Sequence, residues 1–381
     1  MSTAFETYQL AHSSFDEREK RAMYEVIESG RFTMGPKVKE FEDNIADFHG
    51  VKNAVMVNSG SSANLLMVGA MIETGKLKAG DDVIVPAVGW STSYLPFHQY
   101  GIRMSFVDVD PYTWNIDCNR VIDAITDRTK AILAINVLGA PCDFTRLQDI
   151  CDEYGLLLLE DNCESFGARW DGKMTGTFGM CGTLSFFFSH HLQTMEGGMI
   201  LTQNDAMADA MRSMRAHGWS RGVYDDKKFN FVHPGYSVRP LEMSGAIGLI
   251  QLDKWQAFYE QRVFNSKHFE KHFGFETWCR MQLRAPIFSK PTWFGLGMVL
   301  CGALAGRRDE ICDHLDANGI ETRPIIAGNF LRQPVMKRID HLPCVAPYAD
   351  SIHNNGFYVG NDNRDLSTPI AKMRELIDGI R

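Results

Sequence analysis

The sequence predicts an α/β protein with a large domain built on a mostly parallel sheet and a smaller C-terminal α/β domain. Between residues 52 and 202, short apolar runs rich in β-branched residues alternate with helical patterns. This alternation is typical of parallel strands covered by helices. The chain has 381 residues, more than one domain usually holds. We therefore place a large domain with an N-terminal arm at residues 1–254 and a small domain at residues 255–381.

The expected elements follow one another in chain order. The predicted strands are NAVMVN from Asn53, DDVIVPA from Asp81, MSFVDVD from Met104, KAILAINVLG from Lys130, GLLLLED from Gly155, TLSFFF from Thr183 and GMILT from Gly198. A helix opens at Gly60, and MADAMRSMRAHG predicts a helix that ends at Gly218. The polar, turn-rich residues 221–240 indicate a loop. A long helical pattern then begins near Leu241 and bridges to the small domain.

Composition and charge favour a small-molecule partner. The formal net charge is -8, and the sequence contains no concentrated Lys/Arg run, so we expect neither nucleic-acid nor membrane binding. No apolar run approaches the ~18 residues that span a bilayer, and the N-terminus lacks a secretion signal. The nine cysteines show no CxC, CxxC or zinc-like spacing. We expect a soluble cytoplasmic protein with reduced thiols and no metal site.

Ligands of parallel α/β sheets bind beyond the carboxyl ends of the strands, so the residues just after each strand are the candidates. NSGSSANLL begins a helix with Gly60, Ser61 and Ser62. Free backbone N–H groups and hydroxyls at a helix N-terminus bind phosphate. Serine is also an ordinary N-cap residue, so this segment by itself does not decide between the two roles.

Asp161 ends a continuous apolar run that predicts a buried central strand. An ionised carboxylate there needs compensation, either from a protonated pyridine nitrogen or from a neighbouring arginine or helix cap. Glu164 is close enough in sequence to reach the phenolic oxygen of the same ring, although a surface turn also explains it. Trp90 offers a flat face for stacking on a heteroaromatic ring, although core packing explains a single tryptophan more simply.

Together these segments resemble the DegT/DnrJ/EryC1/StrS sugar aminotransferases, which are fold-type I pyridoxal-phosphate enzymes of the aspartate aminotransferase type. The resemblance covers nearly the whole chain and includes RFTMGPKVKEFE, GYSVRPLEMSGAIGLIQL, ETRPIIAGNF and NNGFYVGN. It implies that Ser61 and Ser62, beside Gly60, contact the cofactor phosphate. It also implies that Trp90 stacks on the ring. The resemblance further implies a homodimer with shared active sites.

Two further positions of the family pattern follow the same resemblance. Asp161 is expected to pair with the pyridine nitrogen, and Ser185 to contact the phosphate. The family usually has a lysine five residues after the serine that matches Ser185, and this chain has His190 there. An imidazole cannot tether the cofactor covalently as lysine does. It can move protons near neutral pH, so we expect His190 to be the catalytic acid and base.

The resemblance is greatest to a histidine-containing subgroup, the NDP-4-keto-6-deoxyhexose 3-dehydratases. Members of this subgroup use non-covalent pyridoxamine phosphate to remove the C3 hydroxyl of a nucleotide sugar. One kind carries an iron-sulfur cluster on a cysteine set that includes a CxC, and the other regenerates the amine form of the cofactor from L-glutamate. Because this chain has no CxC, the second kind is expected. The expected substrate is GDP-4-keto-6-deoxy-D-mannose, in 3,6-dideoxysugar biosynthesis for lipopolysaccharide.

Two features depart from the family pattern or leave its register open. The family usually has asparagine in the GYN motif that reaches the partner subunit's cofactor phosphate, and this chain has Ser237, which donates one shorter hydrogen bond. The doubled histidine leaves a question of register, because a shift by one residue would make His191 the base. We expect His191 to point away from the cofactor by strand alternation.

Four cationic side chains are candidates for binding substrate phosphate or the glutamate carboxylate, because a planar guanidinium grips such groups through two hydrogen bonds. They are His217, Arg221, Arg239 and Arg323. Surface salt bridging is an equally good explanation of each.

Two rival functions remain open from the sequence. One is an ordinary nucleotide-sugar 4-aminotransferase, similar to perosamine synthase, whose tethering lysine lies elsewhere. Lys173, Lys227 and Lys228 do not fall in the right context for that role. The other is a catalytically silent regulator that binds the cofactor or a nucleotide sugar. The presence of both Asp161 and a proton-transfer residue argues against a protein without catalytic activity.

Overall fold

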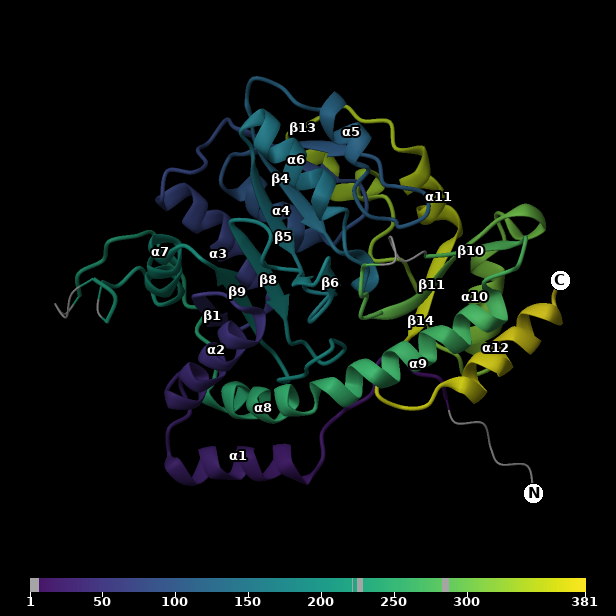
Figure 1. The fold of residues 1–381 in the computed structure, drawn as a ribbon, viewed down its shortest axis with the longest axis horizontal. Helices are drawn as coiled ribbons and strands as arrows, with labels where there is room; N and C mark the ends of the chain where they lie inside the picture. Colours follow the sequence, from purple (N-terminus) through teal and green to yellow (C-terminus); the bar gives the residue numbers. More distant parts are fainter. Residues whose placement is uncertain (1–6, 221, 225–228, 283–287) are drawn as a thin grey trace.

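An eight-stranded sheet forms the centre of the molecule in the computed structural model, which describes residues 7–220, 222–224, 229–282 and 288–381 (Figure 1). The strand order is β1-β9-β8-β5-β4-β2-β3-β13. The strands are β1 (Asn53–Val57), β2 (Asp82–Pro86), β3 (Arg103–Val107), β4 (Thr129–Ile135), β5 (Leu157–Asp161), β8 (Cys181–Ser185), β9 (Gly198–Thr202) and β13 (His341–Leu342). The short hairpin β6 (Arg169–Trp170) and β7 (Lys173–Met174) lies apart from this sheet.

The sheet is mostly parallel, as the sequence predicts. β9 runs antiparallel to both β1 and β8, and the other neighbouring pairs are parallel. Every residue of β1, β2, β8 and β9 is buried, which agrees with the mainly apolar or small side chains of these segments. The parallel register places the carboxyl ends of β5 and β8 at the same edge, because Asp161 pairs with Thr183.

Helices cover this sheet and set the entry to its carboxyl edge. They are α1 (Glu17–Ser29), α2 (Pro36–His49), α3 (Gly60–Glu73), α4 (Ser91–Gln99), α5 (Cys118–Asp123), α6 (Phe144–Tyr154), α7 (Asp205–Arg215) and α8 (Glu242–Asp253). α3 packs between β8, β9 and α7, so most of its residues are buried. Its apolar surroundings fix the position of its N-terminus beside the ends of β5 and β8.

Two predicted helices end or break earlier than expected. α7 ends at Arg215 and not at Gly218, because His217 and Gly218 adopt left-handed φ values of 68° and 83°. Gly218 packs against the carbonyl of His233, which leaves no room for a side chain. The long pattern from Leu241 is divided into α8 and α9 (Trp255–Phe273) at Lys254.

The C-terminal part forms a second sheet, with strand order β10-β11-β14-β12 and antiparallel pairing. Its strands are β10 (Cys279–Met281), β11 (Gly295–Leu300), β12 (Thr322–Pro324) and β14 (Gly356–Gly360), and its helices are α9, α10 (Arg308–Ala317), α11 (Pro347–Asn355) and α12 (Ser367–Asp378). The break between α8 and α9 falls where the sequence predicts the domain boundary. β13 returns from this part to pair with β3 of the large sheet.

The N-terminal arm packs against the small sheet. Tyr8 of the N-terminal arm is buried against the small sheet, where its hydroxyl donates to the Gly360 carbonyl at 2.8 Å. Among the residues that the structure describes, no helix combines the length and the apolar character needed to cross a membrane.

A buried ion pair joins α7 to α2. Arg215 Nη1 lies 2.6 Å from Glu42 Oε1, and each side chain is 7% exposed. We predict that Arg215→Met lowers the free energy of unfolding by about 3–5 kcal/mol, because Glu42 would stay buried without its cation. Arg212 of the same helix pairs with Asp209 at a position about one third exposed, so Arg212→Met should cost under about 1 kcal/mol. Urea denaturation measures both, and equal losses would contradict the prediction.

Candidate active site

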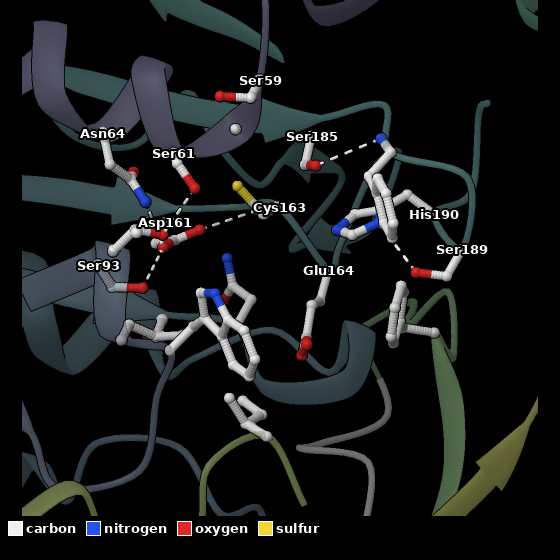
Figure 2. A pocket seen from close by; sticks show the side chains of 18 of the residues that line it. Ser59, Ser61, Asn64, Ser93, Asp161, Cys163, Glu164, Ser185, Ser189 and His190 are labelled. Carbon is white, nitrogen blue, oxygen red and sulfur yellow. Dashed lines mark hydrogen bonds between the residues drawn. The ribbon is translucent and has the colours of Figure 1, made fainter. Parts of the chain in front are cut away.

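A cavity of about 350 Å³ opens at the carboxyl edge of the large sheet. Its walls come from the N-termini of α3 and α4, the ends of β5 and β8, the turn after β8, and residues of β12 and β14. Figure 2 shows how these separate segments direct polar side chains into one space. Of the predicted site residues, those that line it are Gly60, Ser61, Trp90, Asp161, Glu164, Ser185, His190 and Arg323.

The N-terminus of α3 forms one wall of the cavity. Ser59 is its N-cap and accepts a hydrogen bond from the Ser62 N–H at 3.1 Å. Ser61 Oγ donates to Thr92 Oγ1 at 3.0 Å. Gly60 approaches Ser185 so closely that a Cβ on the glycine would lie 2.7 Å from the serine Cβ. This wall combines a helix N-terminus with hydroxyl groups, which suits an anion.

Ser62 is not among the residues that line this cavity, so its contact with the cofactor phosphate stays a prediction. Its hydroxyl accepts a hydrogen bond from Ser59 at 3.1 Å, and Ser59 lines the cavity in its place. The N-cap hydrogen bond explains the difference, because it turns the two serines toward each other at the start of the helix.

Asp161 lies at the end of β5 with 6% of its surface exposed. Its Oδ2 accepts hydrogen bonds from Asn64 Nδ2 at 2.9 Å and from Ser93 Oγ at 2.6 Å, and its Oδ1 accepts from the Cys163 N–H at 3.1 Å (Figure 2). Within the described ranges no lysine or arginine forms an ion pair with it. The carboxylate therefore faces the cavity without a cationic side chain.

Glu164 and Trp90 line the opposite part of the cavity. Glu164 Oε2 accepts the Leu138 N–H at 2.9 Å, and burial raises the pKa of Glu164 to about 7. The carboxyl group can therefore hold a proton near neutral pH and share it with a phenolic oxygen. Trp90 is 56% exposed, so its indole face is available for stacking and is not committed to core packing.

His190 and His191 point in different directions. His190 lines the cavity, and its ring centroid lies 5.0 Å from that of Phe294. Burial, with the nearby Arg262 charge, lowers the pKa of His190 to about 3, so its imidazole is neutral at pH 7. His191 is 2% exposed, and its Nε2 lies 3.3 Å from the Thr292 carbonyl.

The predicted reason for this difference is wrong. β8 ends at Ser185, so strand alternation does not extend to the histidines. The chain turns after the strand, and the His190 N–H donates to the Phe187 carbonyl at 2.8 Å. This turn presents His190 to the cavity and directs His191 toward the interior.

The other predicted ligand-binding residues lie in two places. Arg323 lines the cavity from β12, opposite Tyr358 of β14. Exposed Ser237 and half-buried His217 and Arg239 form a cluster outside the cavity, in which Arg239 Nη1 lies 3.0 Å from His217 Nε2. Arg221 lies outside the described residues.

The sequence did not single out several side chains that shape the site. Asn64, Ser93 and Tyr358 were among those missed. Asn64 lies four residues after Gly60, on the helix face above the N-terminus, and this spacing was the signal that could have identified it. Ser93 and Tyr358 carry no comparable local signal.

The described residues contain no group of three or more His, Cys, Asp or Glu side chains that could hold a metal ion. All nine cysteines are free of disulfide bonds. Cys163 lies against the cavity, where burial and the charge of Asp161 raise its pKa well above the usual value. A neutral thiol is a poor metal ligand and a poor nucleophile.

Comparison with known proteins identifies the lineage. Residues 13–360 match the model of the DegT/DnrJ/EryC1/StrS aminotransferase family. A GDP-4-keto-6-deoxy-D-mannose 3-dehydratase of Yersinia pseudotuberculosis is 43% identical over 387 residues, which cover 97% of this chain and 98% of that protein. The likeness confirms the family that the sequence motifs predict.

Two solved structures extend the comparison. A GDP-4-keto-6-deoxymannose-3-dehydratase with a trapped PLP-glutamate geminal diamine is 42% identical, covers 97% of this chain and 99% of its own, and superposes with a TM-score of 0.93. A variant of ColD, with a serine changed to asparagine and the following histidine to lysine, is 41% identical over 96% of this chain and 100% of its own, with a TM-score of 0.92. These similarities confirm the predicted fold-type I architecture.

Proposed function

The chain belongs to the DegT/DnrJ/EryC1/StrS aminotransferase family, and we propose that it is a pyridoxamine-phosphate-dependent 3-dehydratase of a GDP-4-keto-6-deoxyhexose. The observation that carries the proposal is His190 in the cavity at the position of the family's lysine, together with Asp161 and the N-terminus of α3. GDP-4-keto-6-deoxy-D-mannose is the substrate that the relatives' names indicate. The product would enter 3,6-dideoxysugar biosynthesis for lipopolysaccharide.

The residues of the cavity fit the cofactor. The N-terminus of α3, with Ser59 and Ser61, offers hydrogen-bond donors to a phosphate, and Ser185 adds a hydroxyl from β8. Asp161 has an acceptor position left for a protonated ring nitrogen. A cationic side chain could otherwise occupy this position, but none pairs with Asp161 among the described residues. Trp90 offers its exposed face to the ring. The chemistry that pyridoxamine phosphate supplies here is an amine for the C4 ketone and a ring that accepts electrons.

His190 moves the proton in this scheme. Its neutral imidazole would take a proton from the cofactor carbon that carries the amine and pass it to the C3 hydroxyl, which leaves the sugar as water. Because an imidazole forms no covalent link to the cofactor, the amine form stays free to react with the C4 ketone. An aminotransferase of the 4-amino type requires the tethering lysine, and its position holds His190 in this chain.

The solved variant supports the choice of His190 over His191. In that protein a serine and the histidine after it were changed together. The sequence of this chain contains a single Ser-His pair, Ser189-His190. The pair lies in the turn that presents His190 to the cavity, so the sequence context and the direction of the side chain agree.

L-glutamate is the proposed source of the cofactor amine. A relative was trapped with a PLP-glutamate adduct. In this chain the cysteines are scattered and include no CxC. Regeneration by electron transfer through an iron-sulfur cluster would need a set of cysteine ligands, which this pattern does not offer. The free thiols also agree with a cytoplasmic location.

A homodimer with shared active sites accounts for the cluster of Ser237, His217 and Arg239. These side chains lie outside the cavity of their own subunit and are exposed or half-buried. In the proposed dimer they reach the partner's cofactor phosphate and the substrate phosphates. The serine at position 237 reaches less far than an asparagine, and Arg239 Nη2 lies 3.3 Å from its hydroxyl. The arginine would therefore share the contact.

The first test compares the two histidines. Wild-type protein with pyridoxal phosphate should form 2-oxoglutarate from L-glutamate and convert GDP-4-keto-6-deoxymannose to its 3-deoxy ketosugar, with release of ammonia and without added iron. His190→Asn should abolish both reactions, because both need a proton moved beside the cofactor. His191→Asn should stay active and lose stability instead. Mass spectrometry of both products measures the outcome, and an active His190→Asn beside a dead His191→Asn would reverse the assignment.

The same position offers a gain-of-function control. His190→Lys should attach the cofactor covalently, so that borohydride reduction followed by intact mass analysis finds one added cofactor per chain. Wild-type protein should gain no such mass. An adduct on the wild type would favour the aminotransferase reaction, and binding of the cofactor without any turnover would favour the silent regulator.

The second test concerns Asp161. Asp161→Asn keeps the shape and loses the charge, so the fold should persist while turnover falls by at least about a hundredfold, or about 2.7 kcal/mol in transition-state energy. Turnover within about twofold of wild type would exclude its role at the ring nitrogen.

The third test is complementation between subunits. Arg239→Ala and His190→Asn should each be inactive or strongly impaired, because the substitutions damage opposite halves of a shared site. After the two are unfolded and refolded together, half of the dimers should be mixed and carry one intact site, so about a quarter of wild-type activity should return. Refolding each variant alone is the control. No recovery in the mixture would place both residues in the same subunit's site.

A further inference from the structure

We propose that the polar side chains around Asp161 are positioning residues, which keep its carboxylate ionised and aimed at the cofactor ring nitrogen. They are Asn64, Ser93 and Thr183, and each is 3% exposed or less. The inference deepens the proposed function and rests on its cofactor, but it does not depend on which sugar is the substrate.

The hydrogen bonds to Asp161 all run in one direction. Asn64 Nδ2 and Ser93 Oγ donate to Oδ2, and the Cys163 N–H donates to Oδ1. An ionised carboxylate has about four acceptor positions and no donor. Three are occupied by donors, so one remains for a ring N–H. A protonated Asp161 would place its own hydrogen in that remaining position and would exclude the ring N–H from it.

Thr183 fixes the orientation of Asn64. The Thr183 hydroxyl donates to Asn64 Oδ1 at 2.7 Å, so the amide NH₂ must face Asp161. Without that hydroxyl the amide is free to rotate by half a turn and to place its oxygen against the carboxylate. The hydrogen of the Thr183 hydroxyl thus decides whether Asn64 supports or opposes the charge of Asp161.

Acidic groups with raised pKa values surround this carboxylate on its other sides. Burial and the charge of Asp161 raise the pKa of Cys163, Glu164 and Tyr94. Lysine and arginine form no ion pair with Asp161 among the residues that the structure describes. A cationic ring nitrogen would therefore be the compensating charge, and neutral donors hold the carboxylate ready for it.

The test follows protonation of the bound ring and not only activity. Pyridoxamine phosphate labelled with ¹⁵N in the ring is bound to each variant, and its NMR shift is titrated with pH. Thr183→Val and Ser93→Ala should each lower the midpoint of ring deprotonation by about one pH unit, because a hydrogen bond to an ionised group contributes about a factor of ten. Thr183→Ser keeps the hydroxyl and should keep the wild-type midpoint.

Thr202 provides the matched control. It is a buried threonine of β9 whose hydroxyl donates to the Met180 carbonyl at 2.8 Å. Thr202→Val should lower the urea midpoint of unfolding and leave the ring titration unchanged. If Thr183→Val does not fold, Ser93→Ala on α4 decides the question.

Unchanged titrations in folded Thr183→Val and Ser93→Ala would overturn the inference, and so would an equal shift in Thr202→Val. Wild-type protein that protonates the bound ring but does not dehydrate the sugar would overturn the proposed reaction and leave this inference standing. Wild-type protein that does not bind pyridoxamine phosphate would overturn both.

Discussion

The buried carboxylate at the end of β5 is the interaction on which the site depends. The Asp161 carboxylate is only 6% exposed, so its negative charge needs a compensating partner. The chain supplies three neutral donors to Asp161 and no ion pair among its described residues. Because neutral donors lower the cost of the charge without cancelling it, the cavity keeps a negative potential where a cationic ring can bind. Asp161 therefore links the structure of this sheet edge to the proposed chemistry of the cofactor ring.

The parallel register explains why these donors converge. Asp161 and Thr183 are partners on neighbouring strands, while Asn64 comes from α3 and Ser93 from α4. Both helices begin at the carboxyl edge of the sheet, where the open N–H groups of α3 also favour an anion. One edge thus offers a site for a cation and a site for an anion within the same cavity, as a zwitterionic phosphorylated pyridine requires.

The exchange of lysine for histidine changes the reaction while the surrounding pocket is retained. A histidine in the turn after β8 removes the covalent tether but leaves a neutral base against Phe294. Burial lowers the pKa of His190, so its imidazole is neutral at pH 7 but is a weaker base than a free histidine. Under the proposed function, hydrogen bonds to the phosphate and contacts with the ring, including that of Asp161, would hold the cofactor without a covalent link.

The sequence by itself determined the strands, the family and the position of His190. Buried parallel strands are rich in apolar residues, and the spacing of His190 from Ser185 is a local property of the chain. Tertiary structure decided which side chains meet. Asn64, Ser93 and Thr183 could not be connected in advance, because their hydrogen bonds join residues 97, 68 and 119 positions apart. The directions of Ser62 and His191 were likewise set by an N-cap and by a turn, and neither follows from strand periodicity.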